Sequence, residues 1–294
     1  MRNRKTALSA LVLSILVLGD GMASAQGATP KPVYSTSVDW KTNQITVTAN
    51  VGFTGMHAIL PNARAIGEQI IANDLPAMAR SAFFPLVVDS YSTVGELATK
   101  APTIYSAVEN LLSPRYETYA KLSSNLRALE VRYTLPIFPN LARPFIDQVH
   151  ANPPAQLLSF VPTTRFTGIV IYAKGSLPVH GENSTAAVTP CLFPKIWDES
   201  MQLLASADTV DPAALAKWGV AAYTDSTNET PFTARIGLNP YRTVATGIFG
   251  KYGTDIIISD QAASRILASK ENIDLLTQGR ILIIADSSAV TGGK

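Results

Sequence analysis

The pattern of hydrophobic and polar positions is clearest at Thr167–Gly175, which reads Thr-Gly-Ile-Val-Ile-Tyr-Ala-Lys-Gly. An apolar run of this length without alternation is typical of a strand that is covered on both faces. The closing glycine marks its end. We therefore predict that this run forms the centre of a sheet.

Upstream of this run, alternating and helix-spaced apolar positions occur together. Alternation predicts one hairpin over residues 38–49 and a second over residues 116–135, and Leu86–Asp89 is expected to be a further strand. Ala63, Ile66 and Ile70 have helical spacing, Asp74-Leu75-Pro76 indicates a kink or a second helix, and Pro102 opens another helix. The first half is therefore expected to be an α+β module, residues 33–151.

The best boundary in the chain is Asn152-Pro153-Pro154, because a proline pair neither continues a helix nor enters a central ladder. Beyond it, residues 155–290 predict a mixed α/β module. Its expected strands are Thr167–Gly175, Cys191–Trp197, Met201–Leu204, Gly219–Tyr223, Arg242–Phe249, Thr254–Ser259 and Arg280–Asp286. The last two flank a helical stretch, Asp260–Gln278, which predicts a parallel pair joined by a right-handed crossover.

The N-terminus has the pattern of a secretory signal peptide. Arg2, Arg4 and Lys5 precede an apolar segment, Ala7–Leu18, that is short for a membrane span. Ala23 and Ala25 then form an A-x-A site, so we predict cleavage after Ala25 and a periplasmic protein. The alternative is an uncleaved membrane anchor, which the small residues after the apolar segment disfavour.

Charge and cysteine content limit the classes of partner. Removal of residues 1–25 takes away three basic side chains and one acidic one, so 21 of the 24 basic and 21 of the 22 acidic side chains remain. A chain without a basic excess is not expected to bind nucleic acid or an anionic membrane surface. Cys191 is the single cysteine, which excludes an intramolecular disulfide. We expect no membrane span after the signal peptide.

Motifs for catalysis or metal binding are weak. His57, His150 and His180 are far apart and lack metal-ligand spacing. Cys191 and His180 could form a nucleophile pair, but a cysteine between apolar neighbours is more often buried and inert. The glycines of Gly247–Thr254 do not have the spacing of a phosphate loop, so they indicate a tight connection between two strands. We therefore expect neither an enzyme nor a cofactor.

The most arguable site lies at strand ends. If the two last strands were parallel neighbours, Ser259, Asp260, Asp286 and Ser287 would share one edge of the sheet, where ligands of open α/β sheets bind. Such an edge would suit a cation or a hydroxyl-rich ligand. The alternative is that Ser259 or Asp260 caps the next helix and that Asp286 only marks the end of the fold.

Two tryptophans are candidates for an interaction surface. Trp40 and Trp197 both lie beside predicted turns, where part of the ring can be exposed. Exposed aromatic side chains often anchor interfaces. The alternative is that each ring covers the edge of its own core.

Several segments together resemble bacterial flagellar-assembly envelope proteins of the P and T type, which contribute to outer-membrane-associated rings around the flagellar motor. The similar segments are Phe166–Gly175, Leu192–Glu199, Arg235–Ile248, Gly253–Ser259 and Gly279–Ile284, with Ala63–Ala65 and Val87–Val94 upstream. The loop Ser176–Thr189 is an insertion relative to this pattern. The resemblance carries no catalytic motif and implies a fold relationship and a place in the envelope.

Together these features predict a non-enzymatic periplasmic structural protein. The expected partners are envelope or flagellar proteins, or further copies of the same chain. The alternative is a periplasmic ligand-binding module that uses the edge near Asp260 and Asp286, or the loop Ser176–Thr189.

Overall fold

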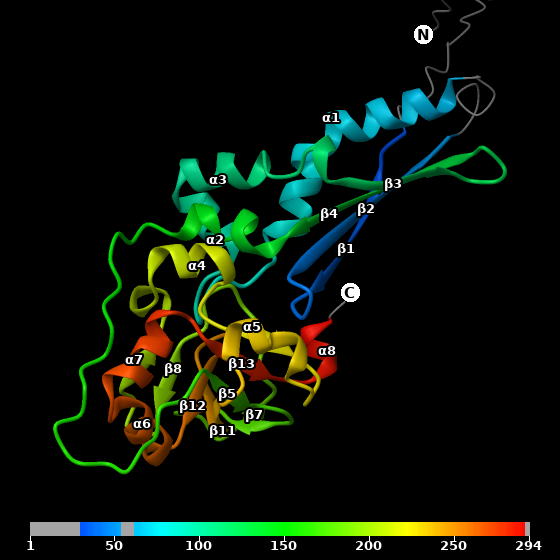
Figure 1. Cartoon of the computed structure of the whole chain (residues 1–294). Helices are drawn as coiled ribbons and strands as arrows, with labels where there is room; N and C mark the ends of the chain where they lie inside the picture. The colour runs from blue at the N-terminus through cyan, green and yellow to red at the C-terminus, as the bar shows by residue number, and fades with distance from the viewer. Residues whose placement is uncertain (1–29, 54–61, 292–294) are drawn as a thin grey trace, which may run out of the picture.

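The computed structural model describes residues 30–53 and 62–291, which form two α+β domains with one sheet of four strands and one of seven (Figure 1). The predicted fold class, two modules with a mixed sheet in the second, is confirmed. The predicted signal peptide, with Ala23 and Ala25, lies outside the described residues, as does His57. Across the described ranges, the helices are too short or too polar to cross a bilayer.

The N-terminal sheet is antiparallel and contains both predicted hairpins. Its strands are β1 (Val33–Asp39), β2 (Gln44–Gly52), β3 (Glu117–Leu122) and β4 (Ala128–Pro136), in the order β1-β2-β4-β3. The alternation in β2 buries Ile45, Val47, Ala49 and Val51 on one face. Apolar side chains on one face of each strand explain why this register is adopted, since a slip of one residue would expose them all.

Helix α1 (Ala63–Phe83) covers the apolar face of this sheet. It is one helix with Pro76 inside it, so the kink is confirmed rather than the second helix, and Figure 1 shows that α1 bends along its length. Gly67 lies at a close contact between the helix and the sheet. A Cβ atom there would be 2.6 Å from the ring of Phe53 and 2.8 Å from a methyl group of Leu129.

Two shorter helices follow, α2 (Val94–Lys100) and α3 (Pro102–Glu109). A capping box between Thr93 and Glu96 begins α2, a signal that our sequence analysis missed. The predicted strand at Leu86–Asp89 is wrong. Val87 makes only an isolated bridge to Thr93, and the segment is a tight loop in which the Val88 amide donates to the Ser92 carbonyl.

The C-terminal sheet has the strand order β10-β13-β5-β11-β12-β8-β9. Its strands are β5 (Ile169–Tyr172), β8 (Ile196–Asp198), β9 (Leu203–Ala205), β10 (Ala222–Thr224), β11 (Tyr241–Phe249), β12 (Asp255–Ile258) and β13 (Ile281–Ile284). The prediction for the apolar run is confirmed, because β5 lies between β13 and β11 and its Ile169, Val170 and Ile171 are at most 1% exposed. The loop Ser176–Thr189 carries a small hairpin, β6 (Leu177–Pro178) and β7 (Thr185–Ala186).

Strand β11 joins two halves of this sheet. Residues 241–244 pair in parallel with β5, and residues 245–249 pair antiparallel with β12, with an irregularity between Ala245 and Gly247. The glycine-rich segment after it is the tight connection to β12 that the sequence predicts.

The predicted parallel pairing of Thr254–Ser259 with Arg280–Asp286 is wrong. Strands β12 and β13 are antiparallel to each other and are separated by β11 and β5. A parallel strand–helix–strand unit does exist, but it consists of β10, α5 (Thr233–Ile236) and β11. The error arose because strands that flank a helix in sequence need not be neighbours in the sheet.

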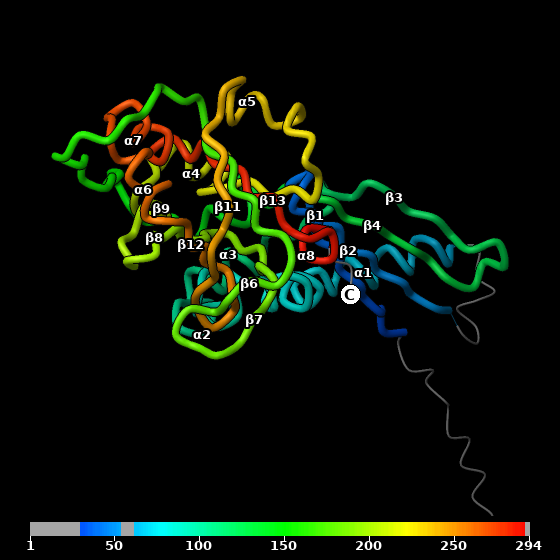
Figure 2. The backbone as a smooth tube through the Cα atoms, turned by 90° about the horizontal axis from the view of Figure 1, so that it is seen from below, coloured from blue at the N-terminus to red at the C-terminus, as the bar shows by residue number. Residues whose placement is uncertain are grey.

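Of the remaining helices, α4 (Pro212–Trp218) packs against residues 137–141 of the N-terminal domain. The C-terminal sheet is contacted by α6 (Asp260–Leu267), α7 (Lys270–Thr277) and α8 (Ser287–Val290). The predicted helical stretch Asp260–Gln278 is therefore two helices, because Ser269 caps a new one. Between the domains, residues 146–168 run without helix or strand along the outside of α6 and α7 (Figures 1 and 2). Their contacts include the Leu157 amide, which donates to the Leu267 carbonyl.

The two domains pack against each other in two places. The amides of Leu192 and Phe193 donate to the carbonyls of Val87 and Val88. At the other place the β1–β2 turn lies against β10 and α8, and the Trp40 amide donates to the Val290 carbonyl. The β3–β4 hairpin points away from the C-terminal domain (Figures 1 and 2).

Candidate functional site

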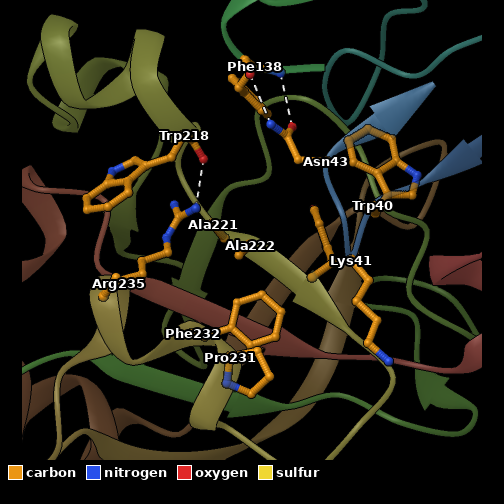
Figure 3. Close-up of a pocket in the computed structure, with 12 residues that line it drawn as sticks. Trp40, Lys41, Asn43, Phe138, Trp218, Ala221, Ala222, Pro231, Phe232 and Arg235 are labelled. Carbon is orange, nitrogen blue, oxygen red and sulfur yellow. Dashed lines mark hydrogen bonds between the residues drawn. The ribbon is translucent and has the colours of Figure 1, made fainter. Parts of the chain in front are cut away.

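A cavity of about 210 Å³ lies at the second contact between the domains; we call it the seam cavity (Figure 3). The N-terminal domain contributes its β1–β2 turn and Phe138, which lies two residues beyond β4. The C-terminal domain contributes the end of α4, β10 and the segment around α5. The lining residues are Trp40, Lys41, Asn43, Phe138, Trp218, Ala221, Ala222, Tyr223, Pro231, Phe232, Ala234 and Arg235.

Aromatic rings form the walls of the seam cavity. The ring of Trp40 meets that of Tyr223 edge-on, with centroids 5.6 Å apart. Phe138 packs against Gly219, where a Cβ atom would be 2.5 Å from the Phe138 ring, and the backbone has a φ of +72°. Glycine is therefore required at the end of α4 both by conformation and by the close approach of the other domain.

The position of Phe138 is fixed by Asn43 in the β1–β2 turn. The Asn43 amide nitrogen donates to the Phe138 carbonyl at 2.9 Å, and its side-chain oxygen accepts from the Phe138 amide at 3.0 Å (Figure 3). Both polar groups of the side chain are paired with the same residue. The Asn43 side chain therefore fixes the part of the cavity wall that Phe138 forms, and both of its polar groups are hydrogen-bonded.

Arg235 lies beside the cavity and is 6% exposed. Its guanidinium donates to the carbonyls of Trp218 (2.7 Å), Gly219 (2.9 Å) and Gly279 (2.8 Å). These carbonyls lie at the ends of α4 and α7, where helices carry partial negative charge. Burial lowers the pKa of Arg235 to about 9, so the side chain remains charged at neutral pH.

A polar network adjoins the seam cavity at the carboxyl ends of β10, β13 and β5. Asp225 accepts from Lys41 Nζ at 3.0 Å and from Ser287 Oγ at 2.8 Å. Lys174 donates to the Asp225 carbonyl, and the Asp286 carboxylate accepts from the Gly175 amide at 3.0 Å. The hydrogen bond from Lys41, and then that from Ser287, lower the pKa of Asp225 below its usual range.

The expectation that Ser259, Asp260, Asp286 and Ser287 share one edge of neighbouring parallel strands is wrong. Asp286 and Ser287 lie at an edge formed by parallel strands, together with Lys174 and Asp225, which the sequence analysis missed. Ser259 and Asp260 are three strand spacings away across the sheet, about 14 Å.

The capping alternative is confirmed for Ser259, whereas Asp260 lies in the first turn of α6 and does not cap it. Ser259 caps α6 by accepting from the Ala262 amide, and Asp260 accepts from the amide and the hydroxyl of Ser200. Both side chains therefore stabilise their own end of the sheet.

The two tryptophan candidates have different outcomes. Trp40 is half-buried and lies at the contact between the domains, where it lines the seam cavity. Trp197 covers the edge of its own core, because its Nε1 donates to Asp255 at 3.0 Å and its ring meets Phe249 edge-on. The structural alternative therefore holds for Trp197.

Cys191 and His180 do not form a catalytic pair. Cys191 is 1% exposed and its sulfur contacts the Tyr223 hydroxyl at 3.9 Å, whereas His180 is exposed on the β6–β7 hairpin. Burial raises the pKa of the Cys191 thiol, so the thiol stays protonated at neutral pH and the nucleophilic thiolate does not form. Over residues 30–53 and 62–291, no group of three or more His, Cys, Asp and Glu side chains is placed to hold a metal ion.

The lining of the seam cavity is mainly apolar, with two cationic side chains at its border. Its two cations are already paired, Lys41 with Asp225 and Arg235 with carbonyls, and its walls are aromatic or small apolar side chains. Only Trp40 among its residues was indicated by the sequence. The others come from segments that are far apart in the chain, and no local pattern marks them.

The fold and the site define a two-domain α+β protein with a cavity where its domains meet. Residues 32–144 match the family model of the N-terminal domain of Treponema pallidum Tp0624, and residues 168–287 match that of the second domain of Tp0624. The chain is thus similar to Tp0624 in two successive domains, on either side of Asn152-Pro153-Pro154. A search of curated proteins gave no match. Neither family description names a flagellar protein, so the flagellar resemblance stays a prediction.

Proposed function

We propose that the protein is a non-enzymatic, periplasmic component of the cell envelope that assembles with protein partners, and that its seam cavity receives an apolar side chain of such a partner. The signal-peptide pattern of residues 1–25 supports export, and the resemblance to flagellar-assembly proteins supports partners that belong to the flagellar motor or the outer envelope.

The composition and size of the seam cavity carry this proposal. Sites for whole small molecules usually have about 300–1,000 Å³. At about 210 Å³ the seam cavity is smaller, and it suits a single aromatic or branched side chain. Lys41, Pro231 and Ala234 at its border are exposed, so a side chain can enter from the surface. Pockets that accept such anchors dominate the affinity of many protein interfaces.

A filled cavity tests the proposal. Ala222 lines the cavity on β10, so Ala222→Phe places a ring in the space that the partner would occupy. Ser81→Phe, on an exposed position of α1, is the matched control. A photoreactive amino acid at Pro231 of the full chain, in living cells, should crosslink one discrete envelope protein. Ala222→Phe should reduce that adduct by roughly tenfold or more, and Ser81→Phe should leave it intact.

An adduct that persists with the filled cavity, or no adduct at all, would contradict the proposal.

The second candidate function is a periplasmic ligand-binding module at the neighbouring strand ends, with Asp286 and Ser287 but without Asp260. The position favours it, because ligands bind beyond the carboxyl ends of parallel strands. A rise in melting temperature with the low-molecular-mass fraction of a periplasmic extract would support this candidate instead.

A further inference from the structure

In the part of the chain that the structure describes, the edge of the N-terminal sheet at β1 has no further strand beside it. Over the residues that the structure describes, β1 has one strand neighbour, β2, with which it pairs in seven consecutive positions without a bulge. Residues 33–38 read Val-Tyr-Ser-Thr-Ser-Val and contain neither a charge nor a proline, so the charge of β1 is confined to its last residue, Asp39. Every second residue of such a strand directs its amide and carbonyl away from the sheet. A regular, uncharged edge is a template for another strand.

The other sheet edges have the usual protection. Strand β3, at the opposite edge of the same sheet, has an irregularity between Glu117 and Tyr119 and carries Lys121. In the C-terminal sheet the edge strands β9 and β10 have three residues each. Bulges, charges and short strands all discourage pairing with another chain. The contrast singles out β1.

A groove of about 580 Å³ lies beside β1, where α1 overhangs the sheet. Tyr34 and Ile70 give it apolar surface, and Asn73 and Asp74 line it on the side of α1. Tyr34 is half-buried and its hydroxyl donates to Asp74, which holds the ring at the groove. An added strand would therefore find both backbone partners on β1 and space for side chains under α1.

We propose that the occupant of this edge is β1 of a second copy, paired antiparallel about a two-fold axis at Thr36. In this register Tyr34 of each copy lies opposite Val38 of the other copy, on the face that α1 covers. Aromatic and β-branched side chains form favourable cross-strand pairs. On the open face it places Ser35 opposite Ser37. No two like charges face each other, and Pro32 limits the paired segment to β1.

The result is a continuous sheet of eight strands across two copies, an isologous interface of the kind that closes dimers. The proposal does not depend on the seam cavity, which is lined by the turn after β1 and by none of residues 33–38. Failure of one proposal therefore leaves the other standing.

Charge substitutions on the open face test the register. Ser35 and Ser37 are exposed, so lysine or glutamate there does not disturb the core. In the full chain, Ser35→Lys/Ser37→Lys and Ser35→Glu/Ser37→Glu each oppose like charges and should weaken dimerisation roughly tenfold or more. An equimolar mixture of the two variants should regain dimers, and Ser35→Lys/Ser37→Glu should dimerise alone. Sedimentation velocity measures all four, with circular dichroism to confirm folding.

A cysteine at the axis gives a second, direct test. Residues directly opposite across two antiparallel strands have Cα atoms about 4.5–5.5 Å apart, within the range that a disulfide spans. Thr36→Cys should therefore form a covalent dimer under oxidation, whereas Thr42→Cys in the exposed turn should not. The native Cys191 is buried and does not interfere. A wild-type chain that stays monomeric at high concentration, or charge variants that dimerise as the wild type does, would overturn the proposal.

Discussion

Replacement of Arg235 by methionine should destabilise the folded protein severely, although the shape of the side chain is nearly kept. Arg235 is almost fully buried, and its three hydrogen bonds run to carbonyls at the ends of two helices. With methionine these carbonyls lose their donor in a place that water reaches poorly. The loss therefore combines three hydrogen bonds with the burial of unpaired acceptors.

The magnitude follows from the opposing terms. A hydrogen bond from a charged donor contributes about 1.5–3 kcal/mol, so three of them contribute roughly 4.5–9 kcal/mol. Removal of the buried cation returns several kcal/mol of desolvation. We expect a net loss of about 3 kcal/mol in the free energy of unfolding, which corresponds to a fall of roughly 6–12 °C in melting temperature for a chain of this size.

Calorimetry and tryptophan fluorescence measure the effect, since Trp218 and Trp40 both line the seam cavity. Lys217→Met is the matched control: Lys217 is exposed and its ammonium lies 4.4 Å from the centroid of the Trp218 ring, so its loss should cost below about 1 kcal/mol. Equal melting temperatures for Arg235→Met and Lys217→Met would refute the reasoning, because the buried hydrogen bonds would then contribute nothing beyond a surface cation.

Three further outcomes are expected. Gly67→Ala should lower the free energy of unfolding by about 1–3 kcal/mol in urea titrations, because its methyl group meets packed side chains, whereas Gly52→Ala, with open space around it, should cost little. The difference in free energy of unfolding between wild type and Asp225→Asn should be largest above the ordinary carboxyl pKa and should disappear as pH falls through the lowered pKa of Asp225. Acid-unfolding curves measure this difference, and a difference that does not change with pH would contradict the prediction. Cys191 should resist alkylation in the folded protein and react only on unfolding; rapid native labelling would show that it is accessible.

The elements that the sequence predicted correctly are those whose signals are local. The alternation of Leu129, Val131, Tyr133 and Leu135 defines β4 because a strand with one buried face needs that period. The apolar run at β5 marks an interior strand for the same kind of reason, since both of its faces lose contact with water.

The errors occur where tertiary contacts decide. Val88 is apolar and buried, as in a strand, but its burial comes from the other domain, whose Phe193 amide donates to its carbonyl. The sequence could not show that β12 and β13 are not neighbours, because β5 and β11, from elsewhere in the chain, lie between them. Arg235 could not be recognised either. An arginine is normally expected at the surface, and only the convergence of two helix ends makes this one a buried donor.

The double membership of β11 has a consequence for how the C-terminal sheet opens. The half with β10, β13 and β5 and the half with β12, β8 and β9 share β11 and no other strand. Residues 241–244 of β11 pair with the first half and residues 245–249 with the second, so amide hydrogen exchange should report the opening of each half in a different part of β11. The two halves can therefore open separately, and the boundary between the two unfolding units lies inside a single strand, between residues 244 and 245.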